Sequence, residues 1–166
     1  MSDLKANEKA DIPAVSEDFV DVYRLYYPRL LRALTLAGAD RNVAEDLAQE
    51  AFARTLVHWR RVRRGTNPPG YLYRSAFRLW GRRLGQPAEA ALPVDGAATP
   101  GAEGEATTRV AIARVLEAMP PRQRLCAVLC LVIGLSVSDA ADALGIAEGT
   151  VRKHLEAARR DLKVVI

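Results

Sequence analysis

The side chains of Asp46, Gln49 and Glu50 share one face of a helix that the sequence predicts near residues 41–62, with Arg54 one turn further on, because residues three and four apart are neighbours on a helix. Paired carboxylates can serve general acid–base catalysis or hold a metal. The sequence supplies no histidine partner, Gly-rich phosphate loop or third ligand for that chemistry. An all-α enzyme is therefore the least favoured function. We expect no catalytic residue, metal or cofactor, and interpret this face as a protein-binding or merely solvated surface.

Cys126 and Cys130 are the only cysteines and lie four residues apart, on one face of a predicted helix. The apolar stretch Leu125–Ile133 surrounds them, and no histidine or second cysteine pair completes a zinc site nearby. We expect both thiols to be structural. The stretch has nine residues, too few to span a bilayer, and the polar N-terminus is unlike a secretory signal. A cytoplasmic protein without membrane insertion is expected.

The charge distribution is far less even than the net charge of +4 suggests. Residues 1–50 contain six Lys and Arg against ten Asp and Glu, whereas residues 51–88 contain nine Arg and no acid. A basic segment of this density favours an anionic partner, and nucleic acid is the first candidate. The alternative is an ordinary solvated Arg-rich face.

A helix predicted near residues 69–84 arranges part of this charge regularly. Arg74, Arg78 and Arg82 recur every four residues and form a ridge. The aromatic residues interleaved with the ridge are Tyr71, Tyr73, Phe77 and Trp80. Rings beside a cationic ridge suit single-stranded or melted nucleic acid, because bases stack on rings while Arg neutralises phosphate. Alternatively the aromatics are core residues; Leu72, Ala76 and Leu79 are expected inside, while Tyr73 and Trp80 fit either interpretation.

The most specific local signal is a helix-turn-helix near the C-terminus. Gly145 supplies the left-handed residue that a tight turn between two helices needs. Ala141, four residues earlier, lets the helices approach, and Val151, six residues later, fills the angle between them. Ile146 is the expected apolar anchor of the turn. Small residue, Gly and apolar residue at these offsets fit the geometry of the motif.

The second helix of this motif, Glu148–Arg160, is the expected recognition helix. Its inner stripe is Val151, Leu155, Ala158 and Leu162, and its outer residues are Glu148, Thr150, Arg152, Lys153, Glu156, Arg159 and Arg160. Recognition helices enter the major groove with their N-terminal residues near base edges. We expect Arg152 and Lys153 to contact guanine or phosphate, Glu148 to accept from cytosine, and Arg159 to contact phosphate. The alternative is a plain helical hairpin with a charged face.

Apolar periodicity predicts an all-α fold of two small helical domains joined by a flexible acidic linker. The predicted boundaries are a flexible arm at 1–15, a helical domain at 16–84, the linker at 85–106 and a helix-turn-helix domain at 107–166. The linker consists almost entirely of Gly, Ala, Pro and acid, which cannot build a core. The expected helices run from Ser16 to Gly38 and near 41–62 (capped by Asp40), 69–84, 107–118, 121–133, 137–144 (capped by Ser136 or Ser138) and 148–163.

Four stretches of the chain together resemble the extracytoplasmic-function (group 4) sigma factors of bacteria, in particular the short actinobacterial type. They are FVDVYRLYYPRLLRAL, AEDLAQEAFARTLVHW, GYLYRSAFRLW and MPPRQRLCAVLCLVIGLSVSDAADALGIAEGTVRKHLEAARRDL, in the family's order. The acidic linker falls where that family joins its regions 2 and 4. The resemblance implies a transcription-initiation factor without covalent chemistry, which binds core RNA polymerase and directs it to promoters.

The resemblance also implies roles for individual residues. The residues implied to dock on the coiled coil of the polymerase β′ subunit are Asp46, Leu47, Gln49, Glu50 and Arg54. Contact with the promoter −10 element falls to Tyr71, Tyr73, Arg74, Arg78, Arg82 and Arg83. Contact with the −35 element falls to Glu148, Thr150, Arg152, Lys153, His154 and Arg159. The implied partners are core polymerase, through the β′ coiled coil and the β flap, promoter DNA and, for some members, an anti-sigma factor.

One departure from the family concerns the third helix. Many relatives carry an Asn and then an Asp where this chain has Arg78 and Arg82, so the family's −10 base preference does not carry over. The competing function is a dimeric helix-turn-helix regulator, which reads palindromic DNA. Its first half would need a ligand pocket or a dimer face, and a run of nine Arg without an acid fits neither.

Overall fold

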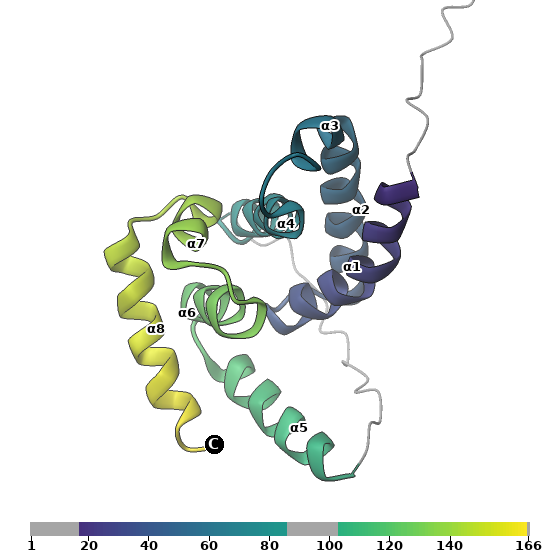
Figure 1. Cartoon of the computed structure of the whole chain (residues 1–166). Coiled ribbons are helices and arrows are strands. Elements are labelled where there is room, and N and C mark those ends of the chain that lie inside the picture. The colour runs from purple at the N-terminus through teal and green to yellow at the C-terminus, as the bar shows by residue number, and fades with distance from the viewer. Residues whose placement is uncertain (1–16, 86–102, 166) are drawn as a thin grey trace, which may run out of the picture.

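The computed structural model describes residues 17–85 and 103–165, and every regular element in these ranges is a helix (Figure 1). The first half contains α1 (Glu17–Leu36), α2 (Arg41–Val57), α3 (Trp59–Val62) and α4 (Pro68–Leu84). The second half contains α5 (Glu103–Ala118), α6 (Pro121–Ala127), the π-helical η1 (Val128–Ile133), α7 (Val137–Leu144) and α8 (Glu148–Leu162). The predicted all-α fold is confirmed for the described residues.

Side-chain caps fix where three of these helices begin. Asp40 accepts a hydrogen bond from the Val43 N–H at 2.9 Å, and Ser136 accepts one from the Asp139 N–H at 3.0 Å. Asn67 caps α4 in the same way at 3.0 Å and precedes two prolines that suit a first helical turn. Gly145, with φ of 65°, ends α7 in the left-handed conformation predicted for the turn before α8.

Two predicted boundaries are wrong. The helix expected over 41–62 breaks at His58, and the short α3 that follows turns Trp59 into the core, where its ring meets Phe19 edge-on at 5.4 Å. The linker expected to reach residue 106 ends earlier, because α5 begins at Glu103; Ala and Glu are strong helix formers. The rest of the linker and the arm at 1–15 lie outside the described residues.

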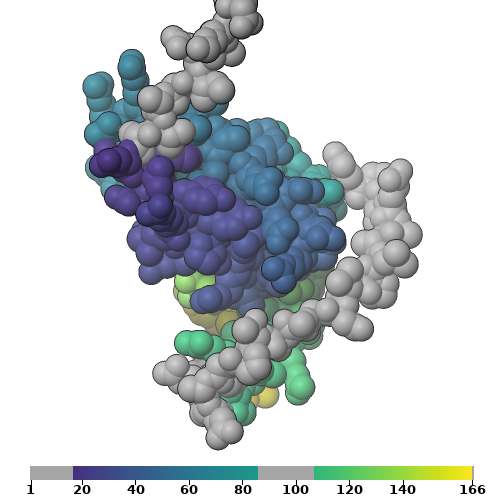
Figure 2. Space-filling view, turned by 90° about the vertical axis from the view of Figure 1, so that its right-hand side faces the viewer, coloured from purple at the N-terminus to yellow at the C-terminus, as the bar shows by residue number. Residues whose placement is uncertain are grey.

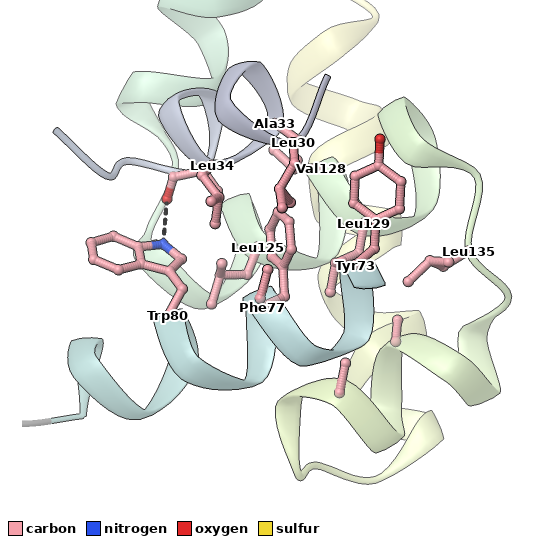
Figure 3. Packing of buried hydrophobic residues seen from close by; sticks show 14 of the residues in the cluster. Leu30, Ala33, Leu34, Tyr73, Phe77, Trp80, Leu125, Val128, Leu129 and Leu135 are labelled. Carbon is pink, nitrogen blue, oxygen red and sulfur yellow. Dashed lines mark hydrogen bonds between the residues drawn. The ribbon is translucent and has the colours of Figure 1, made fainter. Parts of the chain in front are cut away.

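The predicted two helical domains, α1 to α4 and α5 to α8, are both present, and they pack against each other through buried apolar side chains. In the first half, Leu30 and Leu34 of α1 and Phe77 of α4 are fully buried. Leu125 and Val128, from α6 and η1 of the second half, are also fully buried and lie beside Phe77 (Figure 3). The ring of Phe77 therefore fills space between the N-terminal and the C-terminal helices.

Candidate nucleic-acid and protein interfaces

The recognition helix α8 presents its charged face to solvent. Val151, Leu155 and Ala158 are buried against the rest of the second half, as the apolar stripe predicts. The main-chain N–H of Ile146 donates to the Ala141 carbonyl at 3.1 Å and closes the turn before the helix. The inner stripe of α8 is therefore used for packing, and its outer face is left to solvent.

The predicted base- and phosphate-contacting residues of α8 lie together on this outer face. The exposed ones are Glu148, Thr150, Arg152, Lys153 and Arg159, and His154 is half-buried. Arg152 donates to the Glu148 carboxylate at 3.0 Å. Both side chains are largely exposed, so this pair adds little stability and can exchange for contacts with DNA.

Gln123 is a positioning residue that sequence reasoning missed. It is 7 % exposed, and its amide donates to the Asp161 carboxylate of α8 at 2.6 Å. A buried amide with a charged partner stabilises only if that bond is kept. Gln123 therefore ties α6 to α8 by a side-chain hydrogen bond, beside the apolar contacts between the two helices. A glutamine two residues after the predicted start of a helix carries no sequence signal for such a role.

The acidic face of α2 is a second exposed surface. Asp46, Gln49, Glu50 and Arg54 are all exposed, and α2 lies at the surface seen in Figure 2. Arg54 donates to the Glu50 carboxylate at 2.6 Å within the helix. Leu47, expected among the docking residues, is 4 % exposed and packs in the core. It supports the face from beneath instead of presenting a side chain to a partner.

The Arg-rich helix α4 is partly accessible. Arg78, Arg82 and Arg83 are exposed, and Arg74 and Tyr71 are half-buried. Arg74 forms an ion pair with Asp139 of α7 at 3.3 Å, and Arg78 donates to the Asp142 carbonyl at 3.4 Å. Two members of the predicted ridge thus contact the second half of the same chain.

The aromatic residues of α4 are mainly core residues. Phe77, Tyr73 and Trp80 are buried, and the Trp80 indole N–H donates to the Ala37 carbonyl at 3.1 Å (Figure 3). Burial also raises the pKa of the Tyr73 hydroxyl. Tyr73 and Trp80 are therefore core residues, which is one of the two interpretations that the sequence allowed. The expectation that Tyr73 contacts DNA is wrong for this arrangement of the helices.

The cysteines occupy the interior of the second half. Cys126 is fully buried, and its burial raises the thiol pKa to about 11; Cys130 is half-buried and its pKa is raised for the same reason. A thiol with a raised pKa is a poor nucleophile at neutral pH. Among residues 17–85 and 103–165, no group of three or more His, Cys, Asp or Glu could hold a metal ion.

Among the helices of residues 17–85 and 103–165, none is both long enough and apolar enough to cross a membrane.

The chain combines an Arg-rich helical unit with a helix-turn-helix unit. Residues 22–86 match the family model of sigma-70 region 2, and residues 109–162 match that of sigma-70 region 4. The chain belongs to the sigma-70 family, within the extracytoplasmic-function group that its sequence resembles.

Known relatives agree with this placement. The chain is 28 % identical over 153 residues to the ECF RNA polymerase sigma factor SigE of Mycolicibacterium smegmatis, covering 86 % of this chain and 59 % of that protein. The chain therefore spans little more than half the length of this curated relative. The solved sigma factor RpoE from Bartonella quintana, bound to the anti-sigma factor NepR, has a similar fold, with a TM-score of 0.62 and 22 % identity over 90 % of this chain and 97 % of that one.

Proposed function

We propose that this protein is an alternative sigma factor, which binds core RNA polymerase and directs it to promoters with specific −10 and −35 elements. The observation that carries the proposal is the presence of sigma-70 regions 2 and 4 on one chain, in that order. The exposed basic face of α8 and the exposed acidic face of α2 support it, because they offer one surface for DNA and a separate one for protein.

The acidic face of α2 is the proposed polymerase-docking surface. Asp46, Gln49, Glu50 and Arg54 lie on one exposed strip of the helix and would bind the β′ coiled coil. The strip is supported from beneath, because Leu47 of the same turns packs in the core. Region 4 would contact the β flap, which leaves the outer face of α8 for the −35 element.

Each DNA element has its own proposed helix. On α8, Arg152 and Lys153 lie near the helix N-terminus, where side chains reach base edges in the major groove. On α4, Arg82 at the end of the ridge and its neighbour Arg83 are exposed, and their charge would hold the backbone of the −10 element. Sigma factors act by binding and by strand opening, and polymerase performs the chemistry.

Run-off transcription tests the proposal. Core polymerase with this chain should give transcripts of one defined length from a cognate promoter, and core polymerase alone should not. The matched control is a promoter of equal length with a scrambled −35 element, which should give no defined product. A chain that never binds core polymerase, yet binds a palindromic site as a dimer, would be a helix-turn-helix regulator instead.

A further inference from the structure

Four arginines crowd the short helix α3 and the turn after it, and none of them belongs to the proposed DNA contacts of α4 and α8 or to the docking strip of α2. They are Arg60, Arg61, Arg63 and Arg64, here called the α3 cluster, and all four are exposed. They lie within residues 51–88, which contain nine Arg and no acid. The α3 cluster is therefore a dense positive patch of region 2 that the proposed function leaves unused.

The packing of α3 fixes where these arginines lie. Trp59 and Val62, three residues apart, are both buried and hold one face of α3 against the core. The arginines between and after them are left on the solvent side. The turn that follows is tight, because the Gly65 N–H donates to the Val62 carbonyl at 3.1 Å and a Cβ at position 65 would lie 3.2 Å from that oxygen. The α3 cluster is thus presented on a hydrogen-bonded, anchored backbone.

Little negative charge balances the α3 cluster. Asp18, in the first turn of α1, pairs with Arg63 at 3.0 Å. The Asp18 and Arg63 side chains are 61 % and 49 % exposed, so this pair adds little stability and can exchange for another anion. Within the described part of the chain, no acid pairs with the other three arginines. Most of the charge of the cluster is therefore free to meet an anionic partner.

The density of this charge favours duplex DNA as the partner. A helix rises about 1.5 Å per residue, so the backbone that carries the four arginines spans only about 6 Å. Duplex DNA carries one negative charge per about 1.7 Å of its axis, twice the density of a single strand. The one aromatic residue of α3, Trp59, is buried, so this helix offers no ring on which unpaired bases could stack. The α3 cluster matches the phosphates of a duplex better than a melted strand.

We propose that the α3 cluster binds the phosphate backbone of duplex DNA without sequence preference, as a surface separate from the −10 contacts of α4 and the −35 contacts of α8. The proposal rests on the proposed function and extends its DNA interface. Helix α3 directly follows α2, which carries the docking strip, and lies apart from α8 (Figure 1). Phosphate contacts there would position a duplex and leave base reading to other helices.

The test compares three double variants of the full chain. Arg60→Ala with Arg64→Ala removes two charges from the α3 cluster. Arg24→Ala with Arg32→Ala is the matched control, because both side chains are exposed on α1 of the same region and belong to no proposed interface. Arg60→Lys with Arg64→Lys keeps the charge in place. All six substitutions replace exposed side chains, so each variant should fold as the wild type does.

The measurement is fluorescence anisotropy of a labelled duplex of random sequence, titrated with the full chain at salt concentrations from about 50 to about 200 mM. Each lost phosphate contact lowers the slope of log affinity against log salt by about 0.9. The alanine variant of the α3 cluster should bind more weakly than wild type and lose about 1.8 of this slope, so its deficit in affinity should shrink about 12-fold across the salt range. The control and the lysine variant should keep the slope of the wild type.

Asp18→Asn should strengthen binding instead. It frees Arg63 from its ion pair and should tighten binding of the random duplex by up to about fivefold, the equivalent of one exposed ion pair. Asp21→Asn is the matched control, because Asp21 is exposed three residues further along α1 and the charge change is the same. An Asp18 variant that binds no more tightly than the Asp21 variant would contradict the proposal.

Two further results would overturn the proposal. The first is an equal loss of affinity and slope in the alanine variant of the α3 cluster and in its α1 control, because the overall charge of region 2 would then explain the binding. The second is a loss of affinity for a single strand of the same sequence with none for the duplex. These assays contain no polymerase, so failed run-off transcription by the wild type would overturn only the proposed function.

Discussion

Helices α4 and α8 carry the same type of charge and differ in what surrounds it. On α8, Arg152, Lys153 and Arg159 face solvent, and only the apolar stripe is used for packing. On α4, Arg74 and Arg78 contact α7, and the aromatic residues between them form core. The comparison shows that the same charge pattern can leave a helix open along its whole outer face, as on α8, or engage some of its arginines in contacts within the chain, as on α4.

The largest expected effect comes from Phe77→Ala, which breaks the packing of α4 on both regions. The ring is fully buried between the two halves, and truncation of a core Phe costs about 3–5 kcal/mol of unfolding free energy. Urea denaturation followed by circular dichroism measures the loss. A loss confined to region 2, with the melting of region 4 unchanged, would show that the halves do not share a core.

The acidic face of α2 should matter for polymerase and not for DNA. The double variant Asp46→Ala with Glu50→Ala removes two exposed carboxylates and should weaken binding to core polymerase by about 2 kcal/mol or more, the loss typical of central interface residues. Polymerase affinity is measured by anisotropy of labelled protein. Binding of a −35 duplex serves as the control; equal loss of both activities would indicate misfolding.

The exposed residues of α8 should show sequence dependence. Arg152→Ala or Lys153→Ala should each cost about 1–3 kcal/mol of −35 affinity and relax specificity at one base pair, if the side chain contacts a base. Anisotropy with a set of single-base variants of the −35 duplex measures both quantities. An equal loss of affinity for every duplex in the set would show that the residue contacts phosphate. Its role would then be the one proposed for the exposed arginines of α4.

The smallest effect concerns how α8 is held. Gln123→Ala removes the 2.6 Å bond to Asp161. Because that carboxylate is exposed, the loss should be about 1 kcal/mol, the net contribution of an ordinary hydrogen bond. We expect a lower melting temperature and weaker −35 binding in parallel. Gln123→Glu should lower the melting temperature more than Gln123→Ala, because it places a second carboxylate beside Asp161. The reverse order would show that Gln123 does not position α8.

Local chemistry explains which parts of the fold could be predicted. Asp40 and Gly145 act on their own few neighbours, so the start of α2 and the end of α7 follow from sequence alone. The outer face of α8 follows from its periodicity for the same reason. These features need no knowledge of what packs against them.

The rest depended on contacts between residues far apart in the chain. Tyr73 and Leu47 become core residues only once α1, α4 and η1 are assembled. Arg74 and Arg78 find their partners on α7, 65 and 64 residues further along. Spacing within α4 describes a ridge and cannot show that another helix covers it.

Footprinting of a cognate promoter tests the central claim most directly. Core polymerase with this chain should protect the −10 and −35 elements together, and permanganate should modify unpaired thymines only around the −10 element. The chain alone should protect at most the −35 element. Protection of a palindromic site by the chain alone, unchanged when polymerase is added, would contradict the account.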